Sequence, residues 1–213
     1  MLLPYLDRLD PERQEVFKKL KYFNRNFVLA GGTAIMLQIG HRLSYDFDCF
    51  SEKPLLKNTD KMAYDIFGKD IAIRVQTRDQ ITLVTPTSVE ITFVCYPYKP
   101  LEKVIEADFI PLFHLDDLAA NKAMTIGKRG AWRDYVDLFL LLKKKLYSID
   151  SLINLAKQKF AGMFSERLFL GQLGYFDDLD ITAITFIKES YDEEEIKSFL
   201  ENKVEEYLRK RLH

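Results

Sequence analysis

Two aspartates one residue apart, Asp46 and Asp48, follow the sequence Gly31-Gly32-Thr33. In a β-strand, residues i and i+2 point to the same face, so the two carboxylates would lie side by side. Paired carboxylates suit a magnesium ion that carries a nucleotide phosphate. The glycines precede a short helical pattern, whose first N–H groups can bind that phosphate. The alternative is a pair of surface carboxylates on a strand edge, but the order of turn, helix and acidic strand favours the phosphate–metal site.

A second Asp-x-Asp sequence, at 178–180, is interpreted as the start of a helix.

A second group of charged residues comprises Lys122, Asp134 and Asp137. The two aspartates are three residues apart and therefore share a helical face. In a helical hairpin they would converge with Lys122 of the preceding helix. Either the lysine contacts a triphosphate and an aspartate positions it or acts as a base, or the group is an ordinary surface salt bridge. This segment alone favours the salt bridge, because exposed pairs are common.

The hydrophobic periodicity predicts a mixed first part and a helical second part. Arg78-Asp79 predicts a tight hairpin, and Gly130, 147–150, Gly171 and Gly174 are predicted to interrupt the helices after Leu115. Residues 1–112 are therefore expected to form an α/β core and residues 113–213 a helical domain, giving an α+β fold class. The predicted helices span 11–23, 33–39, 55–67 and, near the C-terminus, about 191–210; the predicted strands span 27–30, 45–50, 71–77, 80–85 and 89–96.

Composition excludes some functional classes. The 31 basic and 32 acidic residues balance, so no global charge favours nucleic acid or a membrane. Lys128-Arg129 and residues 143–145 form either a modest RNA-facing patch or a solvated face. Cys49 and Cys95 lack metal-site spacing and are expected to be buried free thiols in a reducing compartment. With no signal-peptide pattern and no membrane span, a cytoplasmic protein is expected.

Together these motifs resemble a known family. The segment FVLAGGTAIMLQIGHRLSYDFDCFS resembles the opening of the AbiEii-type nucleotidyltransferases, which include toxins of type IV toxin–antitoxin and abortive-infection systems. The segment LDDLAANKAMTIGKRGAWRDYVDLFLLLKK resembles the later lysine and arginine–aspartate motifs of that family. The resemblance extends over roughly residues 25–145. It implies a small mixed sheet, with the Gly-Gly turn and the metal carboxylates at one end, and a helical domain that completes the active-site cleft.

The resemblance also implies residue roles. Arg42 either contacts phosphate or pairs with a nearby carboxylate, and Ser44 matches the same run of the family. The remaining implied roles are triphosphate binding by Gly31, Gly32 and Thr33, metal binding by Asp46 and Asp48, phosphate contact by Lys122, and completion of the catalytic site by Asp134 or Asp137.

One position departs from the family pattern. Two-metal nucleotidyl transfer usually needs a third carboxylate on a neighbouring strand. Where many relatives place that aspartate, this chain has Thr92. Glu90 lies two residues earlier on the same face and is either a third metal ligand or a solvent-facing residue.

The resemblance implies a nucleotidyltransferase that uses Mg²⁺ or Mn²⁺. It would move a nucleotidyl group from a nucleoside triphosphate to an RNA, tRNA included, or to a protein. The cellular role would be that of a toxin or a phage-defence protein, with a cognate antitoxin as partner. The alternative, which Thr92 motivates, is a nucleotide-binding protein of the same fold with weak or no catalysis that acts through partner binding.

Overall fold

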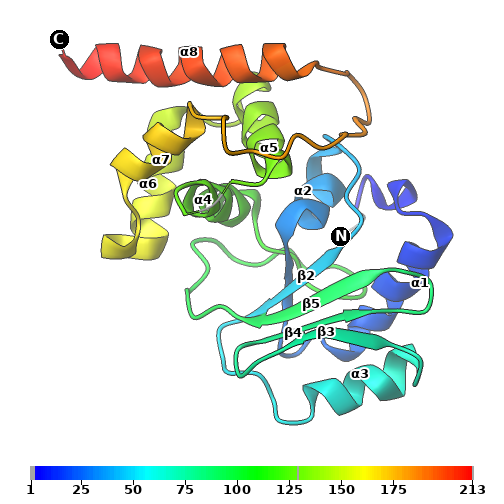
Figure 1. Ribbon diagram of the computed structural model, residues 1–213. Helices are drawn as coiled ribbons and strands as arrows, with labels where there is room; N and C mark the ends of the chain where they lie inside the picture. The colour runs from blue at the N-terminus through cyan, green and yellow to red at the C-terminus, as the bar shows by residue number, and fades with distance from the viewer. Residues whose placement is uncertain (1–2, 129, 213) are drawn as a thin grey trace. The chain divides into compact units, whose positions relative to one another are not determined.

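The computed structural model describes residues 3–128 and 130–212, so Arg129 of the predicted basic patch lies outside the described residues. The chain divides into two compact units, Met1–Leu115 and Asp116–His213. The first unit carries the sheet and the second carries helices only, and Figure 1 shows the elements of each. The α+β fold class predicted from the sequence is confirmed. In the described part of the chain, no helix is both long and apolar enough to cross a membrane.

The first unit is built on a five-stranded sheet in the order β1-β2-β5-β4-β3. Neighbouring strands are antiparallel except β2 and β5, which run parallel. Thr77 N–H donates to the carbonyl of Gln80 across the β3–β4 turn, which confirms the hairpin predicted at Arg78-Asp79. The strands span Val28–Ala30 (β1), Phe47–Ser51 (β2), Ala72–Gln76 (β3), Gln80–Val84 (β4) and Glu90–Cys95 (β5).

Alternation along β2 and β5 separates an apolar face from a polar face. Phe47 of β2 stacks on Phe17, with ring centroids 6.0 Å apart, and Phe93 of β5 packs 4.6 Å from Phe23. Asp48 and Thr92 alternate with these rings, so they project from the opposite face of the sheet. The aromatic core on one face thereby leaves the other face available for polar residues.

Three helices accompany this sheet: α1 (Pro11–Lys19), α2 (Gly31–Ile39) and α3 (Thr59–Phe67). Asp10 caps α1 by accepting a hydrogen bond from the Arg13 N–H at 2.9 Å, and Pro11 occupies its first position. The predicted helix over 11–23 is α up to Lys19 and continues as a 3₁₀ turn over Leu20–Tyr22. Gly40 ends α2 in the left-handed region, as its sequence position predicts.

The second unit contains five helices in its described residues: α4 (Leu115–Ile126), α5 (Trp132–Lys143), α6 (Ile149–Phe160), α7 (Glu166–Leu173) and α8 (Glu193–Leu212). Gly174 ends α7, but Gly171 lies inside that helix, so the interruption predicted there is wrong. The helix start predicted at 178–180 is also wrong, because these residues belong to an irregular segment between α7 and α8. Asp178 and Asp180 are exposed there, and no helical turn needs their side chains as caps.

A buried ion pair joins α4 to α6. Lys159 Nζ lies 2.7 Å from Asp117 Oδ1, and both side chains are 0% exposed. Next to it, the Tyr147 hydroxyl donates to Asp116. Burial and this hydrogen bond raise the pKa of Tyr147 well above its usual range. Two charges can stay in such an interior only while each compensates the other.

Replacement of Lys159 by Met should therefore deprive the buried Asp117 carboxylate of this ammonium. We expect a loss of about 3–5 kcal/mol in the free energy of unfolding, measured by chemical denaturation. The matched control is Lys157→Met on the same helix. The Lys157 side chain is half exposed, and its partner Glu166 keeps Arg211 and Tyr207 as partners, so this change should cost about 0–1 kcal/mol. Equal losses of unfolding free energy in the two variants would show that the buried pair contributes no more to stability than the Lys157–Glu166 pair.

Candidate functional site

The Asp48 carboxylate lies directly against Gly31. The β1–β2 register places Ala30 opposite Asp48, and the chain turns into α2 immediately afterwards. Gly31 has φ +67°, and a Cβ at this position would lie 2.9 Å from Asp48 Cγ and closer still to Oδ2. Only glycine combines this backbone conformation with that approach. The glycines predicted to precede the helix in fact form its first turn, and Ala30 supplies no side-chain cap to it.

Two polar side chains lie over Gly32. A Cβ there would be 2.7 Å from Arg42 Nη2 and 2.9 Å from Ser44 Oγ. Arg42 is buried, and its Nη1 donates to the carbonyl of Leu43 at 2.9 Å. The first turn of α2, the Arg42 guanidinium and the Ser44 hydroxyl are thus gathered in one place. Backbone N–H groups at a helix start, together with a guanidinium, form a suitable environment for phosphate.

Thr33 is also close to the carboxylates, but its side chain is engaged. Its hydroxyl donates to the carbonyl of Asp46 at 2.5 Å, and the residue is buried. The side chain therefore holds the peptide of Asp46. Its backbone N–H in the first turn of α2 remains the group suited to phosphate.

The two aspartates differ in their backbone setting. Asp48 lies inside β2, paired with Ala30 on one side and Thr92 on the other. Asp46 precedes the strand, which begins at Phe47 and not at 45 as predicted. Both aspartates are half-buried, whereas Phe47 and Cys49 between and after them are buried, so the predicted alternation holds. Burial, with a smaller contribution from the Asp48 charge, raises the pKa of the Cys49 thiol.

Thr92 occupies the position beside Asp48 on β5. Its hydroxyl lies 3.1 Å from that of Thr82 on β4, so the two form a hydrogen bond. Glu90 begins β5 and is half-buried. Among the described residues, no group of three or more His, Cys, Asp or Glu side chains is arranged to hold a metal ion, so Glu90 does not join the two aspartates in such a group.

The two aspartates nonetheless fit a magnesium ion chemically. Mg²⁺ in nucleotide sites is commonly bound by one or two carboxylates, with substrate phosphates and waters completing the octahedron. The close packing of Asp48 on Gly31 fixes one such carboxylate next to the phosphate-suited first turn of α2. A third protein carboxylate is not required by this coordination.

The second unit brings the predicted lysine–aspartate group together. Lys122 Nζ lies 2.6 Å from Asp134 Oδ1 and 2.6 Å from Asp137 Oδ2, so α4 and α5 converge as the sequence predicts. The side chains of Lys122 and Asp134 are 10% exposed and that of Asp137 is 0% exposed. The group is thus an interhelix salt bridge, as one of the two alternatives had it, but the surface position expected for it is wrong. Two carboxylates from α5 thus hold the Lys122 ammonium in position.

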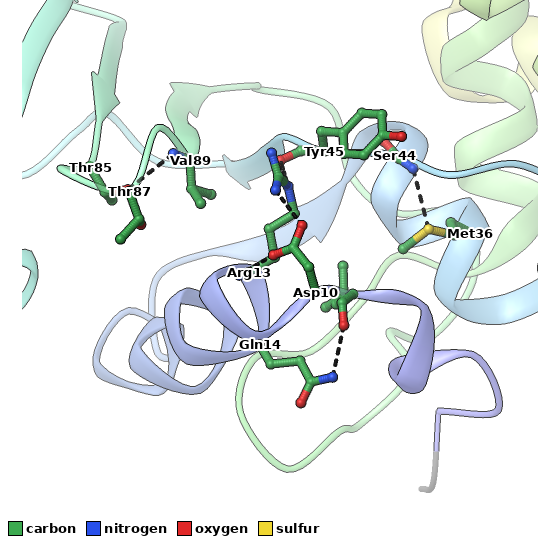
Figure 2. A network of polar contacts seen from close by, with 10 residues as sticks. Asp10, Arg13, Gln14, Met36, Ser44, Tyr45, Thr85, Thr87 and Val89 are labelled. Carbon is green, nitrogen blue, oxygen red and sulfur yellow. Dashed lines mark hydrogen bonds and ion pairs between the residues drawn. The ribbon is translucent and has the colours of Figure 1, made fainter. Parts of the chain in front are cut away.

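Sequence reasoning missed one residue near the carboxylates, Arg13 of α1. Figure 2 shows its guanidinium between Asp10 and Tyr45, where Nε donates to the carbonyl of Tyr45 at 2.8 Å. In the same view, the Ser44 N–H contacts Met36 Sδ at 3.3 Å. No motif marks Arg13, because its partner lies 32 residues away and is a backbone carbonyl. Sequence spacing carries no signal for such a contact.

The fit of Gly31 against Asp48 generates a test. Gly31→Ala should lower the free energy of unfolding by about 1–3 kcal/mol, because it adds left-handed strain and a clash with the carboxylate. The control is Gly171→Ala, since a Cβ at Gly171 of α7 meets nothing within 4 Å and alanine favours a helix. Chemical denaturation measures both. A Gly31→Ala variant as stable as Gly171→Ala would contradict this account of the turn.

Comparison with known proteins places the chain in a family. Residues 19–211 match the family model described as "Nucleotidyl transferase AbiEii toxin, Type IV TA system". The protein aq_aa25 of Aquifex aeolicus (strain VF5) is 30% identical over 208 residues, which cover 94% of this chain and 98% of that protein.

Solved structures share the fold. A putative nucleotidyltransferase from H. pylori superposes with a TM-score of 0.57 at 18% identity, covering 96% of this chain and 99% of that one. The nucleotidyltransferase toxin MenT4 from Mycobacterium tuberculosis H37Rv gives 0.57 at 12% identity, covering 91% of this chain and 80% of that one. The family match extends over most of the chain and includes both groups of charged residues described above. The chain therefore belongs to the AbiEii family of nucleotidyltransferase toxins, and it is a nucleotidyltransferase.

Proposed function

We propose that this nucleotidyltransferase moves a nucleotidyl group from a nucleoside triphosphate to a hydroxyl of an RNA, tRNA included, or of a protein, using Mg²⁺ or Mn²⁺. The observation that carries the proposal is the packing of the Asp48 carboxylate against Gly31 at the first turn of α2. The contact supports the proposal because it brings a carboxylate that could bind a metal next to a helix start that could bind a phosphate.

The triphosphate would be bound by the first turn of α2 with Arg42 and Ser44. Backbone N–H groups of Gly32 and Thr33 would donate to phosphate oxygens, and the Arg42 guanidinium would add a charge-assisted contact. Asp46 and Asp48 would hold the metal. The metal would supply neutralisation of phosphate charge and polarisation of the phosphoryl group whose phosphorus is attacked.

The transfer forms one bond and breaks one. The acceptor oxygen attacks the α-phosphorus, the bond from that phosphorus to the bridging oxygen breaks, and pyrophosphate leaves. The hydroxyl proton passes to a base or to water. We assign phosphate contact to Lys122, whose ammonium is held in position by Asp134 and Asp137. Since both aspartates are buried and paired with it, positioning Lys122 is a better assignment for them than a base role.

The family also motivates a partner and a cellular role. Its description as a type IV toxin–antitoxin system supports an antitoxin as partner and a toxin or phage-defence role for this chain. The cytoplasmic location stays a prediction from the sequence. The predicted RNA-facing patch likewise stays a prediction, and residues 143–145 are exposed as such a role requires.

The first test incubates the purified protein with each labelled nucleoside triphosphate, Mg²⁺ or Mn²⁺, total RNA and cell protein. We expect the wild type to label one acceptor class and Asp48→Asn to lower transfer at least about 100-fold, which corresponds to about 2.7 kcal/mol of lost transition-state stabilisation. The matched control replaces the exposed Asp178 and Asp180 by Asn, removing the other Asp-x-Asp pair, and should transfer like the wild type. Undiminished transfer by Asp48→Asn would refute the assignment.

The second candidate is nucleotide binding with weak or no catalysis, and Thr92 is the observation that favours it. If Asp46 and Asp48 suffice to bind the metal, Mg²⁺ needs no third protein ligand. Thr92→Asp should then change the transfer rate less than about 10-fold. Thr92→Ser serves as the control for loss of the methyl group. If the wild type binds nucleotide without transfer, and Thr92→Asp gains transfer, the second candidate is correct.

A further inference from the structure

The segment that leads Asp46 into the sheet is held by side chains. Residues 43–46 are irregular, and the ladders of β2 begin only at Phe47. Three successive residues of the segment instead contact side chains of two helices. Met36 contacts the Ser44 N–H at 3.3 Å, Arg13 donates to the Tyr45 carbonyl at 2.8 Å, and Thr33 donates to the Asp46 carbonyl at 2.5 Å (Figure 2 shows the first two).

These contacts fix the backbone on both sides of Asp46. The Tyr45 carbonyl belongs to the peptide plane before the Asp46 Cα, and the Asp46 carbonyl belongs to the plane after it. Arg13 holds the first plane and Thr33 holds the second. With both planes fixed, the φ and ψ angles of Asp46 are fixed, and so is the direction of its Cα–Cβ bond. Asp48 needs no such support, since strands flank it on both sides.

Arg13 is itself held rigidly. Its Nη1 lies 2.5 Å from Asp10 Oδ2, and its guanidinium lies 4.9 Å from the centre of the Tyr45 ring. Asp10 is also the cap of α1, so one carboxylate fixes both the helix start and the guanidinium. Although burial opposes it, hydrogen bonds from Arg13 lower the pKa of Asp10, so this carboxylate is ionised at neutral pH. The planar guanidinium of arginine can donate to the Asp10 carboxylate and to the Tyr45 carbonyl at the same time, whereas a lysine has no such arrangement of donors.

The helix that carries Arg13 is anchored to the same strand that Asp46 enters. Phe17 of α1 is buried and stacks on Phe47, the residue that follows Asp46. Arg13 therefore projects from a helix whose distance to β2 is set by the aromatic core. The Arg13 guanidinium therefore connects α1 to residues 43–46 at a fixed distance.

We propose that Arg13 is a positioning residue, which aims the Asp46 carboxylate at the metal that carries the substrate triphosphate. The proposal rests on the function proposed above, in which Asp46 is a metal ligand. Arg13 lies on α1, ahead of the residues 19–211 that the family model matches. It acts through the backbone of Asp46 and needs no contact with substrate.

The test measures metal binding as well as transfer. Arg13→Gln removes the guanidinium and with it the ion pair to Asp10. The Mn²⁺ affinity of this variant is measured by electron paramagnetic resonance in the presence of each of the four common ribonucleoside triphosphates. We expect the Mn²⁺ dissociation constant, and the Mg²⁺ concentration for half-maximal transfer, to rise about 10- to 100-fold. Excess Mg²⁺ should restore most of the transfer rate, because Asp46 can still reach the metal at a cost. Arg13→Lys should lie between Arg13→Gln and the wild type.

A matched control separates this effect from a general weakening of α1. Lys19→Gln removes the only other cation of α1 found in a described ion pair, a loose contact of 3.7 Å with Glu15, and should leave both metal measurements unchanged. The denaturation midpoint of each variant is recorded. If Arg13→Gln proves too unstable, Arg13→Lys carries the same test. In the background of Asp46→Asn, Arg13→Gln should add no further loss of metal affinity, because the ligand it aims is already gone.

The outcomes distinguish the two proposals. If Asp48→Asn binds metal and nucleotide like the wild type, the proposed function fails. If Asp48→Asn loses this binding while Arg13→Gln keeps wild-type metal affinity, the proposed function stands and the role of Arg13 is overturned. A loss of affinity in Arg13→Gln that persists in the Asp46→Asn background would also overturn it, since the loss would then not act through Asp46.

Discussion

The Asp48 carboxylate fills the space in which a side chain at position 31 would lie, and much of the first unit follows from that contact. The contact requires a glycine with positive φ where β1 ends, and it requires β1 and β2 to be neighbours in the register that pairs Ala30 with Asp48. Next to this contact, α2 begins without a side-chain cap, because its N-cap residue is Ala30. The Arg42 guanidinium lies over the following glycine, Gly32. Under the proposed function, a triphosphate with its metal would bring charges opposite to those of this arrangement.

The second unit depends on a different constraint, which is the cost of burying charge. Lys122 lies between two carboxylates, and Lys159 lies against Asp117 with both side chains fully buried. Both pairs involve α4, and each joins it to a different helix. Ion pairs of this kind contribute little net stability compared with apolar packing, but they penalise any displacement that separates the partners. They therefore define the register of α4 against α5 and α6 more sharply than its small apolar residues can.

The sequence predicted what is local. Alternation located Asp48 among buried neighbours, Gly40 marked the end of α2, and the spacing of Asp134 and Asp137 predicted their convergence with Lys122. The failures have physical reasons as well. Gly171 was expected to interrupt a helix, but a glycine with open space around it costs only about 1 kcal/mol in α7. The burial of the Lys122 group was missed because charge composition predicts exposure, and only tertiary packing shows that the charges compensate one another.

Arg13 illustrates the limit most clearly. A side chain that donates to a distant backbone carbonyl leaves no residue-type pattern, since every residue has that carbonyl. The segment before β2 is irregular, and strands pair with β2 only from Phe47 onward. Side-chain donors from α1 and α2 replace the ladder there. Arg13 and Thr33 hold the peptides on both sides of Asp46 and so act on its backbone. Under the proposed function, a direct ion pair between an arginine and the Asp46 carboxylate would compete with the metal for the carboxylate oxygens.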